Sequence, residues 1–576
     1  YEQNIVIWLI DDDADELFLI TKTLLKLNNS ILVQCFENPE EAQRKRAEIQ
    51  GKTETQTSIQ KPEAPQPSKA NPAKSISRNE ALKESDRVLI ENKNLSGSIS
   101  LRGALIDDII LKNYRETLDP NSKPIVLLSP KKYEQGYFVE SGWATTKSDI
   151  KVPDNNSLWQ IKEGKKLTPN SPITLEWNSR EGLIFSKKIE IDDKYLFKIT
   201  ETVRNDKNRA VDLFHYGQIT KNAKPTTENF YILHEGLIGV VDKNLKEETY
   251  SAVEKEKKTY NGKSGWFGIT DKYWMSAIIP ESGKSFKGEY SYTNNYKANF
   301  IISEPNTIGP QKSTTSNIKI FIGAKEVYPI DSYAEKEKID RFDLAIDWGW
   351  FYFITKPLFF VIDYIFKIVG NFGVAIIILT ALVRIVFFPL SNYSFKSMAK
   401  MKVLQPEMLR IKELYKDDVR RTQQEMMALY KREKVNPLSG CLPILVQIPI
   451  FFAVYKMLFV TLEMRHAPFF GWIKDLSAAD PTTIFNLFGL IPWEPPTFLM
   501  IGIWPILMGI TMYLQQKLNP APPDPIQAKI FAWFPFIITI MLASFPSGLV
   551  IYWTASNILT MAQQYYIMRK TTVKTV

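Results

Sequence analysis

Five long apolar runs crowd into the last part of the chain, residues 341–576, and they constrain its fold more than any other feature. Each run has about 16–22 residues, close to the roughly 20 that a helix needs to cross a hydrocarbon core of about 30 Å. Because only helices and closed barrels satisfy their backbone groups in lipid, the runs predict membrane-spanning helices. They cover 371–390, 441–462, 498–514, 530–545 and 549–567.

A further apolar segment, 350–370, lies just ahead of the first run and differs from the others by carrying Lys356, Asp363 and Lys367. These charges and the many aromatic rings favour an amphipathic helix in the membrane interface. A sixth spanning helix is the alternative. We therefore predict an interfacial helix over 341–370 and a membrane core over 371–567.

The basic residues of the loops predict how the helices are oriented. The loop 391–440 holds 11 Lys and Arg residues, whereas the loop 463–497 holds only Arg465 and Lys474. Because positively charged loops stay in the cytoplasm, 391–440 is expected inside the cell and 95–340 outside it. The tail 568–576 is also basic and is expected in the cytoplasm.

Residues 95–340 show a different pattern, in which apolar and polar residues alternate over short runs broken by Gly, Asn, Asp and Pro. Examples are YLFKITETV, NFIIS and NIKIFIGA. A period of two is typical of strands that bury one face, so we predict an antiparallel sandwich. The expected fold class is therefore multidomain, with a five-span α-helical membrane core and an external all-β domain.

The segments ahead of the sandwich have patterns of their own. Residues 41–94 contain no Phe, Trp or Tyr and are rich in polar residues and Pro, which predicts a disordered linker. Residues 1–40 resemble the start of a response-regulator receiver, with a strand, an acidic pair at Asp11 and Asp12, a helix and a second strand. The linker follows before the later receiver strands, so we expect a fragment without regulatory function.

Arg384 is the most unusual residue of the membrane runs. It lies six residues before the end of the run 371–390, about 9 Å inside it at 1.5 Å per residue. A cation in lipid is costly and marks a functional site, unless its long side chain snorkels to the interface. Thr380 lies one turn earlier on the same helix face, so the two residues predict a polar stripe that faces water or protein.

Glutamine residues lie towards the cytoplasmic ends of the other runs. Gln447 is in the second run, Gln515 and Gln516 end the third, and Gln563 and Gln564 are late in the fifth. Together with the arginine they suggest a groove that is open to the cytoplasm and closed outside. The alternative is that each amide joins neighbouring helices by hydrogen bonds.

The loop 391–440 has a helical pattern of its own, with Met398, Met401, Met408 and Met426 on its apolar positions. This pattern predicts an antiparallel helical hairpin in the cytoplasm. Flexible Met side chains suit an adaptable binding surface, and the basic face suits anionic lipid or ribosomal RNA. The alternatives are that the Met residues only fill the hairpin seam and that the charges form a solvated face.

The chain lacks the signatures of common enzyme sites. Its two cysteines exclude a disulfide framework and a Cys-rich zinc site, and its three histidines lie far apart in sequence. No P-loop, G-x-S-x-G or H-E-x-x-H motif is present. The net charge of +9 is too diffuse to indicate a nucleic-acid-binding protein. We expect no enzyme activity, no metal, no cofactor and no specific DNA partner.

Long stretches of the C-terminal region resemble the YidC family of bacterial membrane-protein insertases, among them QQEMMALYKREKVNPLSGCLPILVQIPIFFAVYKML, ILMGITMYLQQKLNP and FPSGLVIYWTASNILTMAQQYYI. In residues 95–340, SGSISLRGALIDDIIL and GWFGITDKYWMSAIIP resemble the large external domain of Gram-negative members. The resemblance implies a super-sandwich related to sugar mutarotases, without known catalysis. It also implies a multi-pass protein of the inner membrane, with 95–340 in the periplasm and a first span that residues 1–94 do not show.

The resemblance further implies a set of groove residues and a mechanism. Arg384 matches the groove arginine of the family and Thr380 its neighbour, Gln447 and Gln516 match groove-lining amides, and Tyr552 and Trp553 match a position that often holds two aromatic residues. In the family, a hydrated groove receives the polar tail of a nascent membrane protein, and the apolar span of that protein then slides into lipid without ATP. The implied function is that of an insertase and membrane chaperone. The expected partners are nascent membrane proteins, lipids, a Sec-type translocon and the ribosome.

Three other functions fit parts of the sequence. A solute transporter fits the apolar runs, but these show no inverted repeat. A carbohydrate-active enzyme on a membrane anchor fits the external domain, and it predicts that Arg384 is dispensable. A receiver-controlled sensor fits residues 1–40 and requires that they take up phosphate.

Overall fold

The computed structural model describes residues 5–10, 31–36, 76–225, 227, 233–416, 418–436, 442–491, 493, 495–496, 499–519 and 525–572. The chain divides into two compact units, Tyr1–Lys61 and Pro62–Val576. In the first unit, β1 (Ile5–Ile10) and β2 (Ile31–Phe36) pair in parallel, and these are the two strands that the sequence predicts there. The acidic pair Asp11 and Asp12 and the first part of the predicted linker lie outside the described residues.

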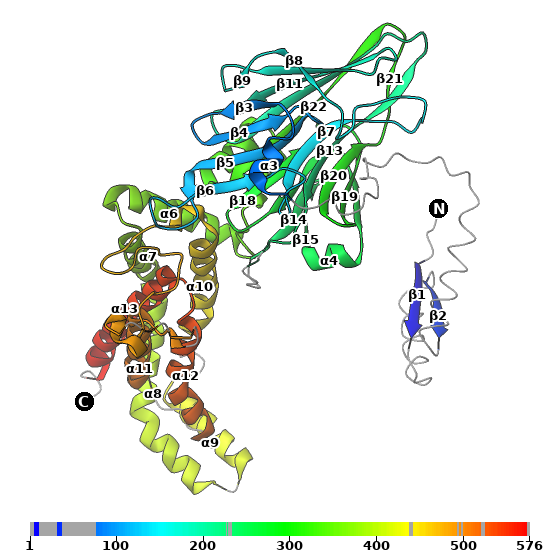
Figure 1. Cartoon of the computed structure of the whole chain (residues 1–576). Helices are drawn as coiled ribbons and strands as arrows, with labels where there is room; N and C mark the ends of the chain where they lie inside the picture. The colour runs from blue at the N-terminus through cyan, green and yellow to red at the C-terminus, as the bar shows by residue number, and fades with distance from the viewer. Residues whose placement is uncertain are drawn as a thin grey trace. The chain divides into compact units, whose positions relative to one another are not determined.

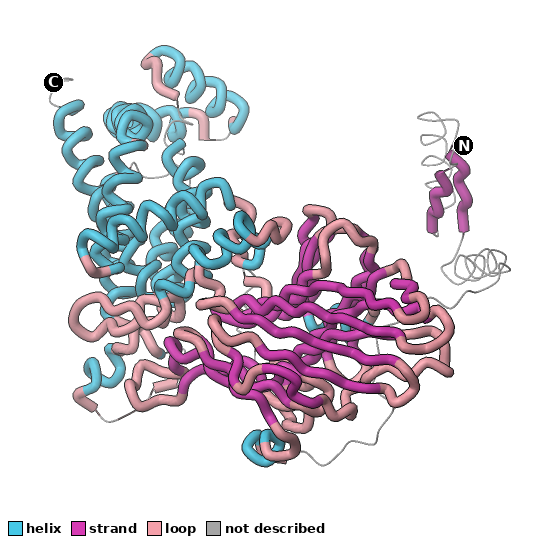
Figure 2. The backbone as a smooth tube through the Cα atoms, turned by 90° about the horizontal axis from the view of Figure 1, so that it is seen from above, coloured by secondary structure: helices cyan, strands magenta, loops and turns pink. Residues whose placement is uncertain are grey.

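The external domain is a sandwich of two large sheets, as the alternating pattern predicts. Figure 2 shows its strands gathered in one body and the C-terminal helices in another. Across the first sheet the strands are β15 (Asn244–Thr249), β14 (Gly236–Val241), β17 (Gly265–Thr270), β18 (Trp274–Ile279), β22 (Lys312–Ala324), β12 (Leu196–Asn205), β11 (Leu183–Ile191), β10 (Ile173–Asn178) and β8 (Gln160–Glu163).

The second sheet faces the first across the core of the sandwich (Figure 1). Its neighbouring strands are antiparallel except for the short parallel pair of β3 and β9. In order they are β16 (Lys258–Gly262), β19 (Phe286–Tyr292), β20 (Tyr296–Ile302), β13 (Val211–Lys221), β7 (Tyr137–Ala144), β5 (Leu105–Arg115), β4 (Leu95–Ser100), β3 (Arg87–Glu91) and β9 (Lys166–Leu167), with β21 (Asn306–Ile308) beside β13 and β6 (Pro124–Leu128) beside β5.

The inner faces of the two sheets form one core of aliphatic and aromatic side chains. Along β11, Leu183, Phe185, Ile189 and Ile191 are buried, whereas every second residue, at 184, 186, 188 and 190, is more exposed. Burying one such side chain stabilises the fold by about 1.5–3 kcal/mol, which explains why the period of two predicts the sandwich. Lys187 occupies the same buried face of β11, so the core also contains charge.

The predicted linker 41–94 is wrong in its last part. Helix α3 (Arg78–Leu82) and strand β3 both lie within it, and Val88 and Ile90 of β3 are buried. The lack of aromatic residues suggests disorder, but β3 buries alternate residues and pairs with β4, so tertiary contacts override the composition.

The predicted interfacial helix 341–370 also begins too early. After α4 (Tyr250–Lys255) in the sandwich, the domain ends with α5 (Val327–Lys336) and the 3-10 turn η1 (Phe342–Ala345). The ring of Phe342 is fully buried, 5.3 Å from those of Trp266 and Phe321. The apolar residues just after 341 therefore belong to the sandwich core. The interfacial segment forms a helix only from Tyr352, in α6 (Tyr352–Val369).

The C-terminal region consists mainly of helices (Figure 1). Helix α7 ends at Val386, and α8 starts at Phe388 with a bend of 69° between them, so the predicted first span 371–390 is broken. Pro389 in the first turn of α8 favours a new helix start there, because proline cannot donate a backbone hydrogen bond. After α6, the elements are α7 (Phe372–Val386), α8 (Phe388–Leu414), α9 (Val419–Arg432), α10 (Leu442–Val460), η3 (Leu462–Met464), η4 (Ile484–Gly489), α11 (Ile503–Leu518), α12 (Pro525–Leu542) and α13 (Ser547–Thr572).

Helix α7 ends four residues before the end of the first apolar run, whereas α13 extends beyond both ends of the fifth run. Within the described residues, no single helix is both long and apolar enough to span a membrane, whereas the bent pair of α7 and α8 meets that requirement when taken together.

Helices α8 and α9 form an antiparallel hairpin in the loop where the sequence predicts one. The Tyr430 hydroxyl donates to the Met408 sulfur at 3.9 Å, and Ser397 Oγ donates to the Asn436 carbonyl at 3.4 Å. Met408 is buried in this seam, and Met401 and Met426 are half-buried. Met398 packs instead with Phe395 against Ile567 of α13. The methionines therefore mostly fill seams.

Candidate functional site

Helices α7, α10 and α13 bring three of the predicted site residues together. Arg384, in the last turn of α7, donates from Nη2 to Ser556 Oγ of α13 at 2.6 Å. Gln447 Nε2 of α10 donates to the Tyr552 hydroxyl of α13 at 3.0 Å. Tyr552 and Ser556 are four residues apart, so they lie on one face of α13 and align the two contacts. We refer to these four residues as the Arg384 cluster.

The Arg384 cluster holds a cation without a matching anion. Among the described residues, the structure gives the Arg384 guanidinium one hydrogen bond, to a neutral hydroxyl, and no ion pair. A guanidinium has five N–H donors, so most of its donors remain for water or a ligand. A carboxylate is the group that fits them best, because its two oxygens can accept two parallel hydrogen bonds.

Thr380 and Trp553 lie on the same helices but contribute mainly to packing. Thr380 is 1% exposed, and its hydroxyl donates to the Ile376 carbonyl of its own helix at 2.7 Å. The half-buried ring of Trp553 packs on Phe451 of α10, with ring centroids 4.8 Å apart. Protein, rather than an open groove, therefore surrounds the Thr380 end of the predicted polar stripe.

Gln516, Gln563 and Gln564 join helices, as the alternative interpretation predicts for such amides. Gln516 of α11 donates to the Phe531 carbonyl of α12, and no described contact links it to Arg384. Gln564 of α13 donates to Asn519 Oδ1 at 2.8 Å, and Gln563 donates to the Phe388 carbonyl at 3.5 Å.

Sequence reasoning missed Ser556, which lies one turn after Tyr552. A serine inside a helix usually hydrogen-bonds to its own backbone, so its presence in a long apolar run points to no particular partner. The available signal is periodicity: the spacing of four from Tyr552 puts Ser556 on the cluster face.

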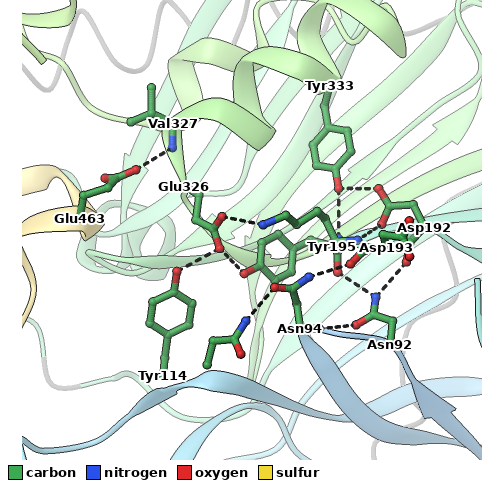
Figure 3. Close-up of polar contacts among 12 residues, drawn as sticks. Asn92, Asn94, Tyr114, Asp192, Asp193, Tyr195, Glu326, Val327, Tyr333 and Glu463 are labelled. Atoms are coloured by element: carbon green, nitrogen blue, oxygen red, sulfur yellow. Dashed lines mark hydrogen bonds and ion pairs between the residues drawn. The ribbon is translucent and has the colours of Figure 1, made fainter. Parts of the chain in front are cut away.

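A second polar cluster joins the sandwich to the helical region (Figure 3). Glu326, which precedes α5, accepts hydrogen bonds from the hydroxyls of Tyr114 and Tyr195 and from Lys194 Nζ at 3.1 Å. With its side chain engaged there, Glu326 does not cap its own helix.

Glu463, in the turn η3 after α10, caps the start of α5 instead, although it lies far from α5 in the sequence. The Val327 amide at the start of α5 donates to Glu463 Oε1 at 3.3 Å (Figure 3). Burial raises the pKa of the Glu463 carboxyl to about 7, and the nearby carboxylates of Glu326 and Asp363 add to the shift. Sequence reasoning did not single out this residue, because its partner lies 136 positions away.

Cations complete this junction around the end of α10. Lys456 Nζ lies 2.7 Å from Asp347 Oδ2, and Arg465 Nη2 donates to the Arg115 carbonyl at 2.7 Å. Lys272 of the sandwich places its Nζ 3.8 Å from the centre of the Phe459 ring. The sandwich therefore contacts the end of α10 that lies opposite the Gln447 end.

Two family models match consecutive parts of this chain. A model of the YidC periplasmic domain matches residues 87–361, and a model described as 60Kd inner membrane protein matches residues 364–574. The first of these matches begins at β3, inside the predicted linker, in agreement with the fold.

Curated relatives match most of the chain. The membrane protein insertase YidC of Pelagibacter ubique (strain HTCC1062) is 54% identical over 500 residues, covering 87% of this chain and 89% of that protein. The same-named protein of Brucella suis biovar 1 (strain 1330) is 50% identical over 506 residues, covering 87% and 83%. A crystal structure of an active YidC insertase with its first transmembrane domain resolved aligns over 84% of this chain and 93% of that chain, at 15% identity and a TM-score of 0.35.

Proposed function

We propose a route for the substrate from one premise: the chain belongs to the YidC family of membrane protein insertases. It therefore inserts membrane proteins, is not an enzyme and has nascent membrane proteins as substrates. Family members are inner membrane proteins with a periplasmic domain, which here is the sandwich. How the substrate is received, how the helices cross the membrane and which assemblies deliver the substrate are the subjects of the proposal.

The Arg384 cluster receives the polar tail of the substrate. The observation that carries this proposal is that Arg384 bonds only to the Ser556 hydroxyl among the described residues. No anion among the described residues pairs with the guanidinium, so an acidic residue of the tail can bind it. Tyr552 and Gln447, which already bond to each other, supply polar surface beside it.

The energetic benefit is a shorter path through lipid for the tail. A charged residue at the centre of the bilayer costs about 2.5–3.5 kcal/mol on insertion scales, and each such residue of a tail adds to the barrier. A polar cluster part-way across lowers that cost. The apolar span of the substrate then gains free energy by entering lipid, so the step needs no ATP.

The proposed topology has five spans, built on α7, α10, α11, α12 and α13. The sandwich contacts Glu463 and Arg465, so the segment after α10 and the sandwich share one side of the membrane. The basic hairpin of α8 and α9 lies on the opposite side, in the cytoplasm, as does the C-terminus. This places the Arg384 cluster toward the cytoplasmic leaflet.

The hairpin and the helical core are the proposed contacts for delivery of substrates. The exposed Lys and Arg residues of α8 and α9 suit ribosomal RNA and anionic lipid. A Sec-type translocon is the proposed membrane partner for substrates with several spans. A chaperone role for single spans follows from the Arg384 cluster, because the cluster shields polar segments from lipid while the helices pack.

The test is insertion of a single-span substrate with an acidic tail into proteoliposomes, scored by protease protection. Wild-type chain, Arg384→Ala and Ser556→Ala are compared with Arg204→Ala, which removes an exposed arginine of the sandwich as a matched control. We expect a large loss for Arg384→Ala, a smaller loss for Ser556→Ala and none for Arg204→Ala. Wild-type insertion by Arg384→Ala would show that another group receives the tail.

A further inference from the structure

The connection between η3 and α11 presents a row of large apolar side chains on its surface. Leu490 is 83% exposed, and Leu487 and Phe488 are 52% and 50% exposed. We define the outer ridge as the six exposed residues Phe485, Leu487, Phe488, Leu490, Ile491 and Trp493. Such contiguous apolar exposure usually marks a surface that another apolar phase or molecule covers.

Hydrogen bonds within the connection hold the outer ridge in a defined shape. The Phe488 amide donates to the Thr483 carbonyl at 2.9 Å, and the Ile491 amide donates to the Asn486 carbonyl at 3.0 Å. Thr483 Oγ1 donates to the Leu499 carbonyl at 2.8 Å and so ties the two ends of the connection together.

The base of the ridge is fixed to α11 by Asp480, which is 3% exposed. Its carboxylate accepts hydrogen bonds from Trp472 Nε1 at 3.1 Å, from the Thr482 amide at 3.0 Å and from the Trp504 amide at the start of α11 at 3.0 Å. The ridge therefore projects from an anchored base next to a helix of the membrane core.

The backbone of the ridge is strained at two of its exposed residues. Leu487 and Phe488 adopt consecutive left-handed conformations, with φ values of 48° and 59°. Bulky L-residues rarely occupy this region, and strain of this kind persists where the surrounding structure imposes it, often at binding surfaces. Exposure of these two apolar side chains to water would add an unfavourable hydration free energy to the cost of the backbone strain.

We infer that the outer ridge lies in the interfacial layer of the membrane, with its apolar side chains among lipid acyl chains. The segment 481–516 contains a single charged residue, Glu494, whereas a surface for a soluble partner has a polar and charged rim. Trp493 suits the headgroup region, where tryptophan is enriched. Helix α11, the third proposed span, begins at Ile503, ten residues after Trp493.

The assignment of the ridge to the outer leaflet depends on the topology proposed above. The inference that the ridge contacts lipid does not depend on that topology. With the ridge in lipid and Glu463 against the sandwich, the connection after α10 is held at both the membrane and the external domain. The ridge thus fixes the height of the junction relative to the bilayer.

The test uses polarity-sensitive fluorescent labels on single cysteines of the full chain in proteoliposomes. Cys35 and Cys441 are first replaced by serine, and Leu490→Cys is compared with Lys165→Cys, an exposed position in the turn between β8 and β9. Each label is exposed to iodide added outside the vesicles and to lipids with a nitroxide near the top of the acyl chain. Because Leu490 is almost fully exposed, its replacement leaves the packing intact.

We expect the nitroxide lipids to quench the Leu490 label several-fold more than the Lys165 label, and iodide to quench only the Lys165 label. Equal quenching of both labels by iodide would place the ridge in water and overturn the inference. A Leu490 label that neither reagent quenches would show a protein occupant and also overturn it. A Lys165 label shielded from external iodide would instead contradict the proposed orientation, while the nitroxide result would still report on lipid contact.

Discussion

Lys187 of the sandwich is buried beside an anion, whereas the half-buried Arg384 of the helical core has no anion beside it among the described residues. In the sandwich, Lys187 Nζ lies 3.2 Å from Glu201 Oε1, and the two side chains are 3% and 2% exposed. Arg87 pairs with Asp107 in the same domain. In the helical core, Arg384 meets only a neutral hydroxyl among the described residues.

The comparison separates charges that hold a fold from charges that are open to a substrate. Burial opposes ionisation of Glu201, yet Lys187 and His215 lower the pKa of this carboxyl to about 2, so the sandwich fully compensates the ion. A buried ion that has its partner contributes to a unique fold and has little left to offer a ligand. Arg384 lacks that compensation, which a passing carboxylate can supply.

The largest effect is expected from breaking a compensated pair. Lys187→Ala leaves Glu201 buried without its cation and should lower the free energy of unfolding by about 3–5 kcal/mol. Chemical denaturation followed by tryptophan fluorescence measures this change. The matched control is Lys198→Ala, which breaks an ion pair with Glu337 at the surface and should cost at most about 1 kcal/mol. Equal losses for the two variants would remove the distinction between the buried and the exposed pair.

The next effect concerns Glu463, a half-buried acid at the boundary of the two regions. Its Oε2 atom has no hydrogen-bond partner among the described residues. Since its folded pKa of about 7 lies above the ordinary value of 4.5, its stabilising contribution is complete below the ordinary value and is lost as pH rises through 7. At about 1.4 kcal/mol per pKa unit, the full loss is about 3 kcal/mol.

Hydrogen exchange of the Val327 amide at pH 5 and pH 8 measures this loss at the junction. We expect stronger protection at the lower pH in the wild type. Glu463→Gln keeps an oxygen acceptor for that amide and should remove most of the difference. An unchanged pH dependence in Glu463→Gln would assign the titration to another group.

A smaller effect tests the uncompensated cation. Arg384→Gln removes the charge but keeps a polar side chain, and it should slow insertion of a substrate with an acidic tail by about 10–100-fold, the range of a charge-assisted hydrogen bond. A substrate with a neutral tail should be affected much less, and the free energy of unfolding should change little. Initial rates of protease protection measure both substrates. Equal losses for acidic and neutral tails would make Arg384 a structural residue.

The smallest effect is expected from a hydrogen bond within the Arg384 cluster. Tyr552→Phe removes the hydroxyl that accepts from Gln447 and should lower stability by about 1 kcal/mol. Thermal unfolding in detergent measures this loss. Tyr566→Phe, at a position that is 63% exposed, is the matched control and should have no effect. A loss in the control alone would contradict the assigned hydrogen bond.

Local patterns in the sequence were sufficient for much of the fold. The period of two in residues 95–340 predicts the sandwich, because burial of one face of a strand is a local property. The apolar runs locate the C-terminal helices, because the apolar character of a segment is also a local property. Arg384 and Gln447 can be selected as candidates from the apolar runs alone, because polar groups inside such runs are costly wherever they sit. Tyr552 was expected only through the resemblance to the YidC family.

Only the tertiary structure decided which of these residues meet. Ser556 and Glu463 gain their roles from partners 172 and 136 positions away, and no local pattern encodes such a separation. The strand β3 was also missed, because sheet pairing depends on neighbours that composition does not reveal. The break at Phe387 was missed as well, although Pro389 is a local signal for a helix start. Local chemistry determines which side chains need a partner, and the packing of distant helices and strands determines which of them receive one.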